Sequence, residues 1–112
     1  RTLRDAGAHL SFASDWPVSP VDPLLSIQAA MTREKLSSAC PDHRQTLMES
    51  LAGYTVDNAY AEFRETVKGR LAPGLLADVT VLSGDIEAAP AEAVREMTVR
   101  ATVMDGRVVY GG

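Results

Sequence analysis

Apolar side chains alternate with polar or small ones over residues 8–15, close to the start of the chain. In an extended segment, Leu10 and Phe12 fall on one face, and His9, Ser11, Ala13 and Asp15 fall on the other. The alternation ends at Asp15, because Pro17 lacks a backbone N–H and biases Trp16 away from helical geometry. The pattern predicts a β-strand with an acidic residue at its carboxyl end, preceded by a short helical tail over residues 1–5.

Apolar residues recur at helical spacing in the next part of the chain. We expect a helix over residues 23–33, opened by Asp22 as its N-cap residue. Residues 46–64 are also helical by pattern, but residues 53–55 interrupt them, so two short helices are expected, the second of them capped by Thr55. The apolar stripes are Leu24, Ile27 and Met31 in the first helix, and Val56, Ala59, Tyr60 and Phe63 in the last.

The hydrophobic period becomes two after a glycine-containing stretch that begins near residue 68. Strands are predicted over 77–82, 99–104 and 107–110, with a helical turn over 90–97. Asp105-Gly106 is a strong signal for a two-residue hairpin between the last two strands. A boundary near residue 67 thus divides the chain into an α/β part, residues 1–67, and a small β part, residues 68–112.

Composition narrows the class of protein without identifying it. Of 112 residues, 46% are hydrophobic, which is enough for a core. The net charge of −4 and the lack of a basic cluster argue against a nucleic-acid partner. No apolar run approaches the ~20 residues that span a bilayer. The chain begins with Arg1 rather than Met, so the lack of a targeting segment carries no weight. A cytoplasmic location is the default expectation.

Several motifs, taken in order, are similar to those of one enzyme family. They are Ser14-Asp15-Trp16-Pro17-Val18, Pro23-Leu24, Ile27-Gln28-Ala29-Ala30, Thr32-Arg33, Tyr54-Thr55, Asn58-Ala59, Lys68-Gly69, Pro73-Gly74, Ala77-Asp78-Val79 and Asp105-Gly106-Arg107. Together they resemble the amidohydrolase superfamily, in the branch that contains N-substituted formamide deformylase-like enzymes. The resemblance implies the C-terminal part of a (β/α)8 metallo-hydrolase barrel, namely its last strand and helices, followed by part of a β-sandwich.

The resemblance also implies a role for Asp15 in hydrolysis of non-peptide C–N bonds. Asp15 matches the aspartate that touches the active-site metal, expected to be zinc, and accepts a proton from the attacking water. Trp16 would line the pocket for a small amide-type substrate, or else fill the barrel rim. The family's remaining metal ligands would lie before Arg1, so this chain alone is expected to bind no metal and to be inactive. From the residue alone, an ordinary turn residue leading into a proline-containing loop is the favoured interpretation of Asp15, and the surrounding motif reverses that preference.

The other potential metal donors do not form a site with Asp15. His9 would lie about 20 Å away on the same strand, at ~3.3 Å per residue. Cys40 and His43 have the spacing of a ligand pair, but the sequence has no second pair, and both are expected to be loop residues. Catalytic zinc usually takes three protein ligands, so the donor count is too small.

Two other classes of function stay open at this point. The chain could be a non-catalytic, β-rich accessory or interaction domain, or a relative of the barrel enzymes that acts as a deaminase. In either case we expect self-association. The strand over residues 8–15 and the β part would both expose unpaired backbone N–H and C=O groups, which are templates for pairing with another copy.

Overall fold

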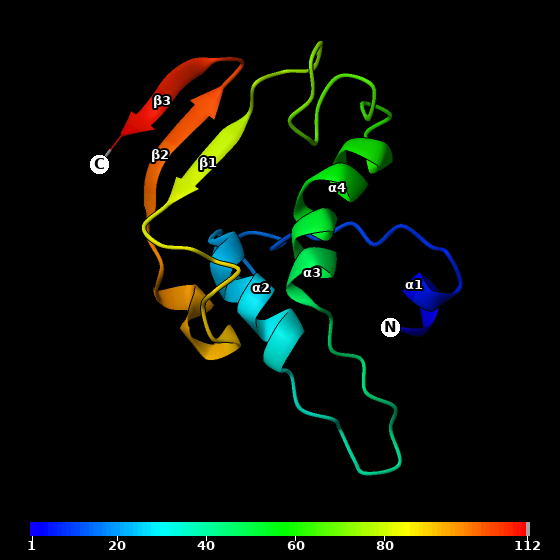
Figure 1. The fold of residues 1–112 in the computed structure, drawn as a ribbon. Helices are drawn as coiled ribbons and strands as arrows, with labels where there is room; N and C mark the ends of the chain where they lie inside the picture. Colours follow the sequence, from blue (N-terminus) through cyan, green and yellow to red (C-terminus); the bar gives the residue numbers. More distant parts are fainter. Residues whose placement is uncertain (112) are drawn as a thin grey trace.

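The computed structural model describes residues 1–111 as an α/β chain with a three-stranded antiparallel sheet (Figure 1). The elements are α1 (Thr2–Asp5), α2 (Pro23–Thr32), α3 (Leu47–Tyr54), α4 (Val56–Ala61), β1 (Val79–Leu82), the 3₁₀ helix η1 (Ala91–Glu96), β2 (Val99–Met104) and β3 (Arg107–Gly111). In Figure 1 the sheet lies beside α2, and α1 lies on the far side of α3 and α4. Of the helices described, none is long and apolar enough to cross a membrane.

Local sequence signals account for the helix boundaries. The side chain of Asp22 accepts a hydrogen bond from the Leu24 N–H at 2.9 Å, which confirms the predicted N-cap of α2. The predicted break between two short helices is also confirmed, because α3 ends at Tyr54 and α4 begins at Val56. At the start of α3, Thr46 and Glu49 form a reciprocal capping box.

Two details of the predicted second helix are wrong. Thr55 occupies the N-cap position of α4, but its hydroxyl donates to the Leu51 carbonyl at 2.8 Å instead of capping the helix. Phe63, expected on the buried stripe, is 89% exposed, because α4 ends at Ala61 and Phe63 adopts a φ of 57°. The chain turns away from the helix axis before Phe63 can join the apolar face.

The sheet confirms the three predicted strands, in the order β1-β2-β3 with antiparallel pairing throughout. The turn between β2 and β3 has a φ of 49° at Asp105 and 75° at Gly106, as a type I′ hairpin turn requires. The Asp78 carboxylate accepts from the Asp105 N–H at 2.8 Å, and the Gly106 N–H donates to the Ala77 carbonyl at 3.1 Å. The residues just before β1 therefore support the hairpin tip.

Replacing Gly106 by valine should lower the free energy of unfolding by roughly 1–3 kcal/mol, because a β-branched residue is strained at positive φ. Urea denaturation of the purified chain measures the loss. Asp105→Asn is the matched control, since asparagine tolerates the left-handed conformation of the same turn. A Gly106→Val variant with the midpoint of the parent would show that the turn tolerates a side chain at this position.

The buried core joins the two predicted parts of the chain. Leu24 and Ile27 of α2 pack with Val94 of η1, and Val94 is fully buried. Partly buried residues around them come from both sides of residue 67: Met31, Leu47, Leu51, Tyr54, Leu82, Ile86 and Met97. One apolar cluster therefore ties the helices to the sheet, and the division at residue 67 stays a prediction.

The predicted β-strand over residues 8–15 is wrong for this structure. Among the residues described, this segment pairs with no strand, and the three strands all come from residues 79–111. The physical reason is that a strand needs a neighbour, and the sheet lies beyond α2, out of reach of this segment (Figure 1). The alternation itself persists, because Leu10 and Phe12 are half-buried while His9 and Asp15 are exposed.

Candidate functional site

Asp15 lies at the start of a tight turn that ends the segment over residues 8–14. Its carbonyl accepts a hydrogen bond from the Val18 N–H at 2.8 Å, and the Trp16–Pro17 peptide bond is cis. Asp15 has a φ of 53°, in the left-handed region that few non-glycine residues adopt. Aspartate adopts this conformation more readily than most residues, and Asp105 adopts it in the hairpin turn, so the backbone of Asp15 marks a tight turn.

The segment that leads to Asp15 lies directly on α3. The Phe12 N–H donates to the Gly53 carbonyl at 3.0 Å, and the Phe12 ring packs edge-on against Tyr54, with ring centroids 5.7 Å apart. A Cβ atom on Gly53 would lie 2.8 Å from Phe12 Cδ2 and 3.0 Å from the Leu10 carbonyl oxygen. Such contacts are too short, so the absence of a side chain at Gly53 permits this approach.

Two neighbouring polar residues of α4 hold the same segment. Asn58 Nδ2 donates to the Phe12 carbonyl at 3.1 Å, and Asn58 Oδ1 accepts from the Ser11 hydroxyl. Asp57 Oδ1 lies 2.8 Å from His9 Nδ1, and the His9 ring stacks on Tyr60 with centroids 4.1 Å apart. We call Gly53, Asp57 and Asn58 the segment seat, since together they contact residues 9–12.

Asp57 is buried and ion-paired, with 6% of its surface exposed. Arg4 Nη2 donates to its second carboxylate oxygen at 3.1 Å. Burial by itself opposes ionisation, but the hydrogen bonds from His9 and Arg4 outweigh it and lower the pKa of Asp57 below the ordinary aspartate value. This stabilisation is therefore present above the unfolded-state pKa, including neutral pH, and is lost as pH falls through the lowered pKa.

The other predicted site residues do not gather around Asp15. Trp16 follows Asp15 in the turn and is 69% exposed, so its ring lines no enclosed pocket. His9 is bound to Asp57, and Cys40 and His43 line a small cavity in the loop between α2 and α3. Within residues 1–111, no group of three or more His, Cys, Asp or Glu side chains could hold a metal ion.

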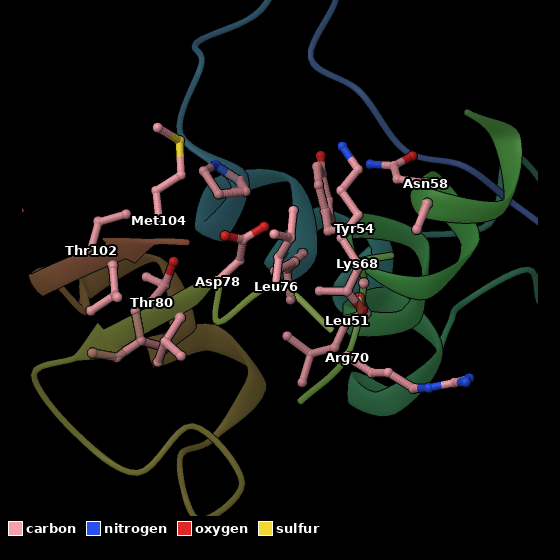
Figure 2. Close-up of a pocket in the computed structure, with 18 of the residues that line it drawn as sticks. Leu51, Tyr54, Asn58, Lys68, Arg70, Leu76, Asp78, Thr80, Thr102 and Met104 are labelled. Atoms are coloured by element: carbon pink, nitrogen blue, oxygen red, sulfur yellow. The ribbon is translucent and has the colours of Figure 1, made fainter. Parts of the chain in front are cut away.

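A cavity of about 680 Å³ lies between the sheet and the helices (Figure 2). Leu51, Tyr54 and Leu76 supply apolar lining, and charged side chains include Lys68 and Asp78. A second cavity, of about 430 Å³, lies between residues 10–13 and the helices α2 and α3. Asp15 lines neither cavity, so the candidate catalytic group and the enclosed space of this chain are separate.

The segment seat was not predicted as a functional feature. Asn58 belongs to a motif that carries the family resemblance, but its hydrogen bonds to Ser11 and Phe12 span more than forty residues of sequence. One signal was present: Asp57 and Asn58 are adjacent polar residues in a helix whose other positions are mostly apolar. Asp57 is buried and Asn58 is half-buried, so their polar groups need partners, which here are Arg4 of α1 and residues of the Asp15 segment.

Comparison with known proteins finds two relatives at the same level of sequence identity. The chain is 34% identical over 115 residues to YtcJ of Bacillus subtilis (strain 168), and 34% identical over 113 residues to the N-substituted formamide deformylase of Arthrobacter pascens. Each comparison covers 98% of this chain. The chain spans only 22% and 21% of the length of these two relatives.

A solved structure shares the fold. The crystal structure of an amidohydrolase from Thermotoga maritima MSB8 matches 98% of this chain with a TM-score of 0.70, at 22% sequence identity, and the match covers 25% of that protein. Its likeness supports the arrangement of helices and sheet described above. The sequence profile of the amidohydrolase family matches residues 1–110, nearly the whole chain. This chain therefore belongs to the amidohydrolase family.

Proposed function

We propose that this chain contributes Asp15 to the hydrolytic site of a metal-dependent amidohydrolase that cleaves non-peptide C–N bonds. The observation that carries the proposal is the place of Asp15 in the motif Ser14–Val18, at the end of a segment that α3 and α4 hold in place. Family membership supports hydrolysis of C–N bonds in general. We use "the complete enzyme" for the assembly in which residues outside this chain supply the remaining metal ligands.

The role proposed for Asp15 is that of a ligand and a proton acceptor. A divalent cation, expected to be zinc, supplies Lewis acidity that polarises the substrate carbonyl and makes water acidic enough to lose a proton near neutral pH. The carboxylate of Asp15 then accepts the proton of the attacking water and passes it to the leaving nitrogen. Its exposed position leaves the carboxylate free to face groups from outside this chain.

The substrate class follows from the relatives rather than from a pocket in this chain. One relative is named for its action on N-substituted formamides, so we propose a small amide-type molecule as substrate. Trp16 would then present its ring to the substrate beside Asp15. Its exposure in this chain supports such a role, because a large apolar ring in water gains from being covered.

Purified alone, the chain should retain far less than one equivalent of zinc after dialysis and should show no chelator-sensitive amidase activity. The reason is the donor count, since Asp15 is one candidate ligand where catalytic zinc usually needs three. Elemental analysis and hydrolysis of a formamide substrate measure the two properties. Stoichiometric zinc with chelator-sensitive hydrolysis would contradict the proposal that the ligand set is completed from outside.

Self-association and a cytoplasmic location also stay proposals. The strand β3 supports the first, because every residue from Arg107 to Gly111 is exposed and the strand pairs on one side only. Exposed apolar side chains on the same strand, Val108 at 72% and Val109 at 55%, add to this tendency.

A further inference from the structure

We propose that Gly53 and Asn58 are positioning residues for Asp15, so that helices α3 and α4 determine where the catalytic carboxylate lies. The inference rests on the proposed function of Asp15. It goes further in assigning a role in that reaction to two helix residues that touch neither the metal nor the substrate. Both residues contact the segment over residues 9–12, and Asp15 follows this segment by three residues.

The segment over residues 9–12 has no strand beside it. A strand inside a sheet is fixed by backbone hydrogen bonds on both sides, whereas this one has no strand partner among residues 1–111. A backbone hydrogen bond joins it to α3, from the Phe12 N–H to the Gly53 carbonyl. Its other anchors are side chains of α4, and the bonds of Asn58 fall on two consecutive residues.

Gly53 controls how deeply the segment packs on the helix. It is buried in the last turn of α3, one residue before the helix ends at Tyr54. Its close contacts explain why this position carries no side chain, because a methyl group would collide with the Phe12 ring and the Leu10 carbonyl. The glycine therefore sets how closely the segment approaches the helix.

Asn58 fixes the register of the segment along α4. Asn58 uses both ends of its amide at once, donating from Nδ2 to the Phe12 carbonyl and accepting at Oδ1 from the Ser11 hydroxyl. This pair of bonds is satisfied in one register only, because neighbouring residues of an extended segment point to opposite sides. His9 reinforces the same register, because it bonds to Asp57 and stacks on Tyr60, one turn further along α4.

Hydrogen exchange of the full 112-residue chain tests the positioning directly. Asn58→Ala should speed exchange of the Phe12 N–H by about 2- to 10-fold, the worth of one net hydrogen bond. Gly53→Ala should speed it roughly 10- to 100-fold, because overpacking displaces the segment. Exchange of the buried α2 amides around Ile27 should not change, which shows that the core stays folded.

Matched variants make the result decisive. Gly84→Ala adds the same methyl group where the nearest atom is Met97 Cε at 3.8 Å, so Phe12 exchange should stay at the parental rate. Ser11→Ala removes the hydroxyl partner of Asn58 from an exposed residue, leaves the helices intact, and should still speed Phe12 exchange. Unchanged Phe12 exchange in Asn58→Ala, Gly53→Ala and Ser11→Ala would overturn the inference.

Kinetics of the complete enzyme separate this inference from the proposed function. We expect Asn58→Ala to lower kcat by roughly 10-fold with KM within about 2-fold. Asn58→Gln keeps the donor and the acceptor of the amide and should restore part of the loss. If Asp15→Asn abolishes turnover while Asn58→Ala leaves kcat at the parental value, the positioning role is wrong and the function of Asp15 stands. If Asp15→Asn leaves turnover intact, the proposed function itself is wrong.

Discussion

Asp15→Asn should lower the kcat of the complete enzyme by a factor on the order of 10²–10⁴, the usual worth of a positioned general base. The amide has nearly the shape of the carboxylate but cannot accept the proton of the attacking water, and it is a weaker ligand for a divalent cation. KM should change much less than kcat, because the loss falls on the transition state. Steady-state kinetics with a formamide substrate measure both constants.

The melting temperature separates a chemical effect from a structural one. Asparagine also tolerates the left-handed conformation, and the backbone bond from Val18 to the residue-15 carbonyl does not depend on the side chain. Asp15→Asn should therefore melt within a few degrees of the parent. Glu87→Gln, the same chemical change at another exposed carboxylate, should leave kcat unaltered. Parental kcat in Asp15→Asn would mean that Asp15 is an ordinary turn residue.

Gly69→Ala should have the largest effect on stability, lowering the free energy of unfolding by roughly 2–5 kcal/mol. Two causes add at this position. Gly69 has a φ of 99°, which strains any L side chain, and a Cβ atom there would lie 2.7 Å from the Cβ of Ala59. Ala59 is itself 2% exposed, so it cannot move aside into solvent. Urea denaturation with a fixed m-value gives the change.

Gly74→Ala is the control that separates the two causes. Gly74 has a similar φ of 88°, but a Cβ atom there meets nothing within 4 Å. This variant should therefore lose only the part due to backbone strain, roughly 1–2 kcal/mol. Equal losses in Gly69→Ala and Gly74→Ala would show that the close approach of Gly69 to α4 does not exist in solution.

Elements that depend on short-range chemistry were predictable from the sequence. The Asp22 cap of α2 and the turn at Asp105-Gly106 each need only residues within a few positions, and the structure has both. The extended segment over residues 8–15 was not predictable in the same way. Its alternation is real, but whether it becomes a strand depends on neighbours that the described chain does not contain.

The same distinction between short-range and long-range contacts applies to the candidate site. Asp15 could be found because its motif lies within five consecutive residues, Ser14 to Val18, that carry a family resemblance. The residues that hold its segment could not, because Gly53 and Asn58 are distant in sequence and their partners appear only when the chain folds. The predicted burial of Phe63 is wrong for a related reason. Its exposure follows from a turn at positive φ that helical periodicity does not reveal.

The most direct test of the central claim is the position of the metal relative to Asp15 in the complete enzyme. Anomalous diffraction at the zinc absorption edge locates the ion without any assumption about its ligands. The account predicts a zinc ion with an Asp15 carboxylate oxygen at about 2.0–2.2 Å, the usual zinc–oxygen distance. A fully occupied zinc ion whose ligand shell lies elsewhere, with the Asp15 carboxylate facing only solvent, would contradict it.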